Sequence, residues 1–148
     1  MTIRHTLTLW TAALSIVVVP ALVTAQTALK SPDQVRRALG VLNRVLDHTG
    51  RLITAKNYAQ LPHENMEFKE GAEAVEKSIG AEPADFRAKI DPLLKKAVAD
   101  SQAVADLSSS KDDAKLAAAY KTFTESEKKV IAAFPASVQP APAAPKKD

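Results

Sequence analysis

Apolar side chains recur at steps of three and four residues along much of this chain, and this spacing restricts its fold more than any other feature. Residues spaced in this way lie on one face of an α-helix. A long helix is predicted over residues 32–56, with Ser31 as its N-terminal cap and Pro32 in its first turn. Its apolar stripe consists of Val35, Leu39, Leu42, Val45, Leu46, Leu52 and Ile53.

Two further segments repeat this spacing after short turns. One is predicted to start near Pro62 and to stop at Gly80, and the other follows a turn and cap at residues 108–113. The inward side chains of the first are Phe68, Ala72, Val75 and Ile79. Those of the second are Leu116, Tyr120, Phe123, Val130 and Phe134.

Between these two lies a fourth amphipathic segment, which contains a proline. It begins at Glu82 and Pro83, and its Pro92 either kinks the helix or marks a second helix start with Asp91 as the cap. The apolar face of this segment consists of Phe86, Ile90, Leu93, Leu94, Ala97 and Val104.

Four amphipathic helices joined by short turns predict an all-α fold. The expected architecture is an antiparallel up-down-up-down four-helix bundle over residues 26–134, because short connections make successive helices antiparallel. An extended coiled-coil hairpin is the alternative. The composition agrees with helices, since 148 residues include only 4 glycines and no cysteine. Residues 135–148 are rich in proline and alanine and are expected to form a disordered tail.

Residues 1–25 have the features of a secretory signal peptide. Arg4 provides a basic start, residues 7–19 form an apolar run, and a V-x-A cleavage motif ends at Ala25. Cleavage is expected before Gln26, and the alternative is a retained membrane anchor. We therefore expect a periplasmic or secreted protein with no stable membrane anchor after cleavage.

Two stretches resemble the cytochromes c′, which are exported four-helix bundles with a covalent haem near the end of the last helix. Residues 41–52 contain His48, Gly50 and Arg51 in the order common at the end of that family's first helix. Residues 116–134 can be laid without a gap on the family's closing segment. The resemblance implies the bundle fold, export, an ancestral electron-transfer or gas-binding role, and a homodimer through the first two helices.

The haem-binding residues of that family are replaced in this chain. The two cysteines of the Cys-x-x-Cys-His motif fall on Glu127 and Val130, and the histidine falls on Ile131. Covalent haem attachment is therefore excluded. Residues 86–91 resemble the third helix of the periplasmic b-type four-helix cytochromes. The side chains available to ligate such a non-covalent haem are His48, His63 and Met66.

Glu127 falls on the apolar stripe of the last helix. A buried carboxylate must be paired, or its pKa must rise to keep it neutral. Arg37 is the predicted partner, and the alternative is that Glu127 lies at the rim and reaches water. The former haem crevice is expected to be filled by side chains or to hold a small apolar ligand. The candidate pocket residues are Leu39, Leu42, Phe86, Tyr120 and Glu127.

Histidines and carboxylates provide candidate metal ligands. His63 and Glu67 are four residues apart on one helix face, which suits a divalent ion or, alternatively, a solvated charged face. His48 is the third candidate, but it is expected to lie too far along the bundle from His63 to share an ion with it. The alternative is that His48 lies at the edge of the apolar stripe and that Asp47, a backbone group or water satisfies its hydrogen bonds.

The sequence favours an exported, non-catalytic binding or accessory module without a cofactor. No nucleophile and base stand at a spacing typical of catalysis, so an enzyme is not expected. Twenty basic and seventeen acidic residues are interspersed and give a formal charge of +3, which gives no reason to expect nucleic acid as a partner. The alternatives are an electron-transfer protein that binds b-haem or a metal without covalent attachment, and a protein–protein interaction module.

Overall fold

The computed structural model describes residues 28–110 and 112–141. Within them lie four long helices, and no strand occurs in this part of the chain, which confirms the all-α class. The predicted signal peptide lies outside the described residues. The helices are α1 (Pro32–Thr54), α2 (Leu61–Ser78), α3 (Ala84–Asp106) and α4 (Asp113–Ala132). Three short 3₁₀ turns accompany them, η1 (Tyr58–Gln60), η2 (Leu107–Ser109) and η3 (Ala136–Val138).

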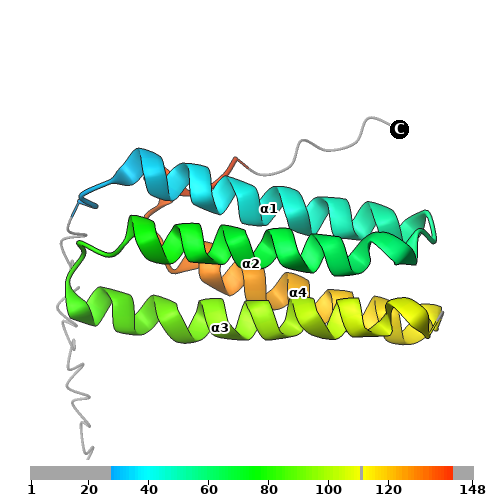
Figure 1. Cartoon of the computed structure of the whole chain (residues 1–148). Helices are drawn as coiled ribbons and strands as arrows, with labels where there is room; N and C mark the ends of the chain where they lie inside the picture. Colours follow the sequence, from blue (N-terminus) through cyan, green and yellow to red (C-terminus); the bar gives the residue numbers. More distant parts are fainter. Residues whose placement is uncertain (1–27, 111, 142–148) are drawn as a thin grey trace, which may run out of the picture.

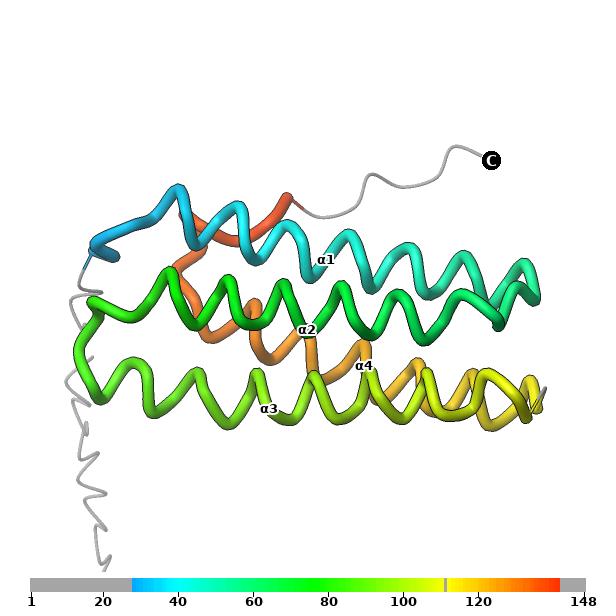
Figure 2. Tube along the Cα trace, in the orientation of Figure 1, coloured from blue at the N-terminus to red at the C-terminus, as the bar shows by residue number. Residues whose placement is uncertain are grey.

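The four helices lie side by side with their long axes roughly aligned (Figures 1 and 2). Each of α2 and α3 contacts the helices before and after it, and α1 also contacts α4. In Figure 1 the colour advances in opposite directions along α1 and α2. None of the helices in the described ranges is both long and apolar enough to cross a membrane.

The core between the helices is filled by apolar side chains from all four of them. Phe68 of α2 and Phe123 of α4 meet edge to face, with ring centroids 4.7 Å apart. All four predicted inward residues of the second helical segment are buried, which confirms that part of the prediction. The largest core side chains that are less than 2% exposed include Phe68, Phe123, Leu39, Leu42, Leu61, Ile79, Ile90, Leu94 and Leu116.

The helix boundaries follow the sequence, with differences in detail. Ser31 does stand at the N-cap of α1, but its side chain makes no capping hydrogen bond, so the predicted cap is wrong in that respect. Asp112 caps α4 by accepting a hydrogen bond from the backbone amide of Lys115 at 3.0 Å. Pro92 does not divide the third segment, because α3 is one continuous helix. Pro92 is exposed, so water can reach the carbonyl that its missing amide leaves without a partner.

The chain does not lose its order at residue 135. It continues into η3, where Val138 is only 1% exposed and belongs to the core. Arg36 of α1 donates a hydrogen bond to the Ser137 carbonyl at 2.9 Å, and Gln139 donates to the Phe134 carbonyl at 2.8 Å. One apolar side chain and two carbonyl contacts therefore hold a proline-rich segment against the bundle. Residues 142–148 lie outside the described residues.

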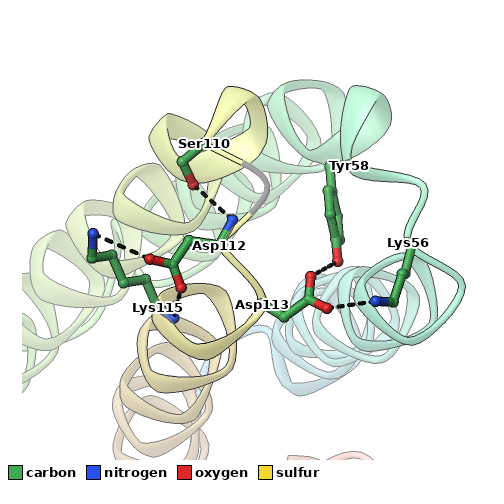
Figure 3. A network of polar contacts seen from close by, with 6 residues as sticks. All are labelled: Lys56, Tyr58, Ser110, Asp112, Asp113 and Lys115. Carbon is green, nitrogen blue, oxygen red and sulfur yellow. Dashed lines mark hydrogen bonds and ion pairs between the residues drawn. The ribbon is translucent and has the colours of Figure 1, made fainter.

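A polar network closes one end of the bundle (Figure 3). Lys56 has a φ of 56° and lies just after α1, in the left-handed conformation that ends many helices. Its ammonium pairs with Asp113 at the start of α4, and the Tyr58 hydroxyl donates to the other oxygen of Asp113. Hydrogen bonds from Lys56 and Tyr58 hold the pKa of Asp113 below its usual value. This network ties the connection between α1 and α2 to α4.

Helix α1 packs closely against α2 at Gly71. A Cβ at this position would lie 2.9 Å from a terminal methyl of Leu42 and 3.1 Å from Val41. Both distances are shorter than ordinary van der Waals contacts, and Leu42 is fully buried. Gly40 on α1 differs, because a Cβ there would meet nothing within 4 Å.

These two glycines give opposite predictions for the same substitution. Gly71→Ala should destabilise the protein by about 1–3 kcal/mol because it overpacks the contact between α1 and α2. Gly40→Ala should stabilise it by roughly 0.5–1 kcal/mol because alanine favours helix and fits without contact. Urea unfolding followed by circular dichroism measures both changes. Equal effects of the two substitutions would contradict the close approach at Gly71.

Candidate functional site

The predicted pocket residues do not surround one cavity. Leu39 and Leu42 are fully buried in the core. Phe86 packs edge to face on Phe134, with centroids 5.7 Å apart, and Tyr120 lies fourteen residues before Phe134. At 1.5 Å per residue of helix, Phe86 and Tyr120 are therefore separated by about 20 Å along the bundle.

Glu127 is buried, as its place on the apolar stripe predicts. It is 2% exposed, and its Oε1 atom has no hydrogen-bond partner in the described part of the chain. The alternative of a rim position is therefore wrong. Burial, and after it the nearby charge of Asp47, raise the pKa of Glu127 from 4.5 to about 7, against an opposing effect of Lys128.

The predicted partner of Glu127 is wrong. Arg37 is exposed, and no ion pair among the described residues joins it to Glu127. Asp47 acts on Glu127 through its charge, and it lies ten residues after Arg37 along α1. That difference is about 15 Å of helix, so Glu127 faces a part of α1 that carries a like charge.

The same seam between α1 and α4 explains a glycine in the string that resembles the cytochromes c′. Tyr120 of α4 is half-buried, and its hydroxyl donates to the Leu46 carbonyl at 3.2 Å. A Cβ on Gly50 would lie only 2.8 Å from Cζ of this ring. Gly50 therefore leaves room for Tyr120 to reach the backbone of α1.

A second group of residues forms a small cavity on the surface between α1 and α2, which we call the α1/α2 notch. Its volume is about 200 Å³. His48 Nδ1 lies 2.9 Å from Glu64 Oε1, and Glu64 is only 3% exposed. The second oxygen of Glu64, Oε2, is buried without a hydrogen-bond partner in the described chain. The residues that line the notch are Arg44, Val45, His48, Arg51, Glu64 and Glu67.

Glu64 is a site residue that the sequence pattern did not predict. Its position near the start of a helix suggests only a favourable charge at the positive end of the helix dipole. The contact with His48 joins two helices and spans sixteen residues of sequence. The one indication in the sequence is that Glu64 stands three residues after Leu61 and four before Phe68, which places it on the inward side of α2.

Two of the three candidate metal ligands, His48 and Glu67, line the α1/α2 notch, whereas His63 does not line it. His63 Nε2 lies 3.1 Å from Glu67 Oε1 on the exposed side of α2, while His48 contacts Glu64 instead. Within residues 28–110 and 112–141, no group of three or more histidine, aspartate or glutamate side chains is placed to hold a metal ion. The structure therefore does not support a metal site made by His48, His63 and Glu67.

The residues at the family's haem positions do not fit a haem. Glu127 and Val130 are buried and Ile131 is half-buried, and none of these side chains supplies a thioether or an imidazole. The candidate ligands for a non-covalent haem lie at the surface and not in the core. Met66 is 51% exposed, and the side chain of His63 is 61% exposed.

No protein-family model matches this chain, and searches of curated proteins and of solved structures returned no match. The resemblance to the cytochromes c′ therefore rests on residues 41–52 and 116–134 alone.

The raised pKa of Glu127 predicts how stability depends on pH. The folded protein keeps the Glu127 proton up to about pH 7, whereas the unfolded chain loses it near pH 4.5. Stability from this group is thus fully present below pH 4.5 and is lost as the pH rises through 7. A difference of one between the folded and unfolded pKa corresponds to about 1.4 kcal/mol, so the loss amounts to roughly 3 kcal/mol.

Glu127→Gln should remove this dependence. The free energy of unfolding of the variant should exceed that of the wild type by an amount that grows from pH 4 to pH 8 and reaches about 3 kcal/mol. Urea unfolding at each pH measures this difference. Glu125→Gln is the matched control, because Glu125 is exposed on the same helix. A stability difference between Glu127→Gln and wild type that stays constant across this range would disprove the assignment.

Proposed function

We propose that this chain is an exported, haem-less relative of the cytochromes c′ that acts as a non-catalytic binding or accessory module in the periplasm. An antiparallel up-down-up-down bundle is part of this proposal. The alternating colour direction along the helices in Figure 1 and the short connections between them support this topology.

The single observation that carries the functional proposal is the packed interior. Phe68 and Phe123 are in edge-to-face contact at the centre of the bundle, and both are 0% exposed. Leu39 and Leu42 of α1 are also fully buried and belong to the same core cluster. Side chains thus take up the space that an internal ligand would need. Binding must therefore occur on the outer surface.

The α1/α2 notch is the surface feature that best suits binding. It combines a cavity with a buried carboxylate, Glu64, that has an unused oxygen atom. An unpartnered buried carboxylate oxygen lowers stability, and a functional role, a bound ion or a bound water is among the reasons for which proteins retain such groups. A mainly apolar interface receives less support, because Met66 is the one large hydrophobic side chain found exposed in the described ranges. A homodimer through α1 and α2 would have to be largely polar.

A haem titration tests the proposal. Purified protein mixed with increasing haem should give the spectrum of free haem, with no saturable Soret band in the oxidised or reduced state, because the core is filled and the candidate ligands lie at the surface. The double variant His48→Ala/His63→Ala is the matched control and should behave in the same way. A Soret band that saturates at one haem per chain, shifts on reduction and disappears in the double variant would refute the proposal.

Export can be tested separately. When the gene product is made with residues 1–25 in a Gram-negative host, the protein should be recovered from the periplasmic fraction with a mass that begins at Gln26. The control is a variant with the apolar run interrupted, Leu14→Arg/Val17→Arg, which should remain in the cytoplasm at full length. Recovery of the uncleaved wild-type chain in the membrane fraction would refute export as a soluble protein.

A further inference from the structure

The two walls of the α1/α2 notch carry opposite charges. On α1, Arg44, His48 and Arg51 follow one another at steps of four and three residues, so they share a face of the helix. On α2, Glu64 and Glu67 are three residues apart and face the same cavity. A ligand in the notch therefore meets cationic groups on one side and carboxylates on the other.

Both walls have unused bonding capacity. Glu64 Oε1 is engaged by His48, whereas Oε2 is buried and unpartnered. Arg44 and Arg51 are exposed, and neither forms an ion pair with another described residue. A hydrogen-bond donor with positive charge would satisfy Glu64, and a carboxylate would satisfy a guanidinium in bidentate geometry.

The volume of the notch limits the size of the ligand. A volume of about 200 Å³ holds roughly seven water molecules at about 30 Å³ each. The notch is smaller than the cavities of about 300–1,000 Å³ that take drug-sized ligands. Larger peptides and cofactors do not fit inside it.

We infer that the α1/α2 notch binds a small zwitterion of the α-amino acid class, with the ammonium group on Glu64 and the carboxylate on Arg44 or Arg51. This inference rests on the proposed function as a binding module and adds the class of ligand. An inorganic anion fits less well, because Glu64 and Glu67 repel it. A simple amine fits less well too, because it leaves both guanidinium groups without a partner.

The ligand class is tested with three probes of matched shape. L-alanine carries both charges, ethylamine is alanine without the carboxylate, and propionate is alanine without the ammonium. Each is titrated into the ¹⁵N-labelled chain, and amide shifts in α1 and α2 are followed by NMR. L-alanine should cause saturable shifts centred on His48 and Glu64. Ethylamine and propionate should bind about ten- to a hundredfold more weakly, because each loses one charge-assisted contact.

Substitutions at the notch test the assigned contacts. Glu64→Gln keeps the shape of the side chain but removes its charge and should weaken alanine binding about ten- to a hundredfold. At least one of Arg44→Gln and Arg51→Gln should weaken it by a similar factor, and both residues are exposed, so these variants should fold. Glu73→Gln is the matched control, because Glu73 lies on α2 but lines a different surface groove.

Three results would overturn the inference. They are no saturable shift with L-alanine, equal affinity for ethylamine or propionate, and unchanged alanine affinity in all three notch variants. Failure of the proposed function is distinguishable from these results, because it requires a saturable Soret band in the haem titration. A protein that neither binds haem nor responds to L-alanine disproves the ligand class and leaves the haem-less module in place.

Discussion

Burial of the apolar stripes of four helices against one another is the interaction on which the rest of this structure depends. The chain has no cysteine and therefore no disulfide to limit the unfolded state. At the centre, Phe68 and Phe123 fill the core with an edge-to-face contact. Close packing of this kind leaves little tolerance for added atoms, which is why Gly71 and Gly50 occur where α1 meets α2 and α4. Apolar side chains from all four helices therefore occupy the interior of the bundle.

Glu64 and Glu127 are both buried carboxyl groups, but the unfavourable free energy of burying a charge is reduced in different ways at the two residues. Glu64 lies beside His48, which engages one of its oxygens across the interface of α1 and α2. Glu127 lies near the like charge of Asp47, and its pKa rises to about 7. Burial of a charge is unfavourable in both places. At Glu64 a neighbouring side chain compensates part of the cost, and a ligand in the notch would compensate more. At Glu127 the carboxyl group instead stays protonated up to about pH 7.

Much of the fold was predictable from local spacing, while the partners of side chains were not. The apolar periodicity placed all four helices and the inward face of α2 correctly, because helix geometry relates residues only three or four positions apart. The same rule placed Glu127 on the apolar stripe of the last helix but left open whether it is buried or lies at the rim. The rule did not specify its partner, since the alignment of α4 along α1 is set by the packing of the whole bundle. Val138 was missed because a proline- and alanine-rich composition indicates little about where one valine finds a contact.

The sequence alone determined the all-α class, the helix boundaries to within a few residues and the absence of cysteine ligands or disulfides, because these depend on periodicity, capping and the presence of particular side chains. Only the tertiary structure decided that Glu64 meets His48, that Arg37 does not meet Glu127, and that the five predicted pocket residues do not form one cavity. The physical reason is that such contacts join residues far apart in the chain. Their distances depend on the relative shift and rotation of whole helices, which the pattern within each helix does not specify.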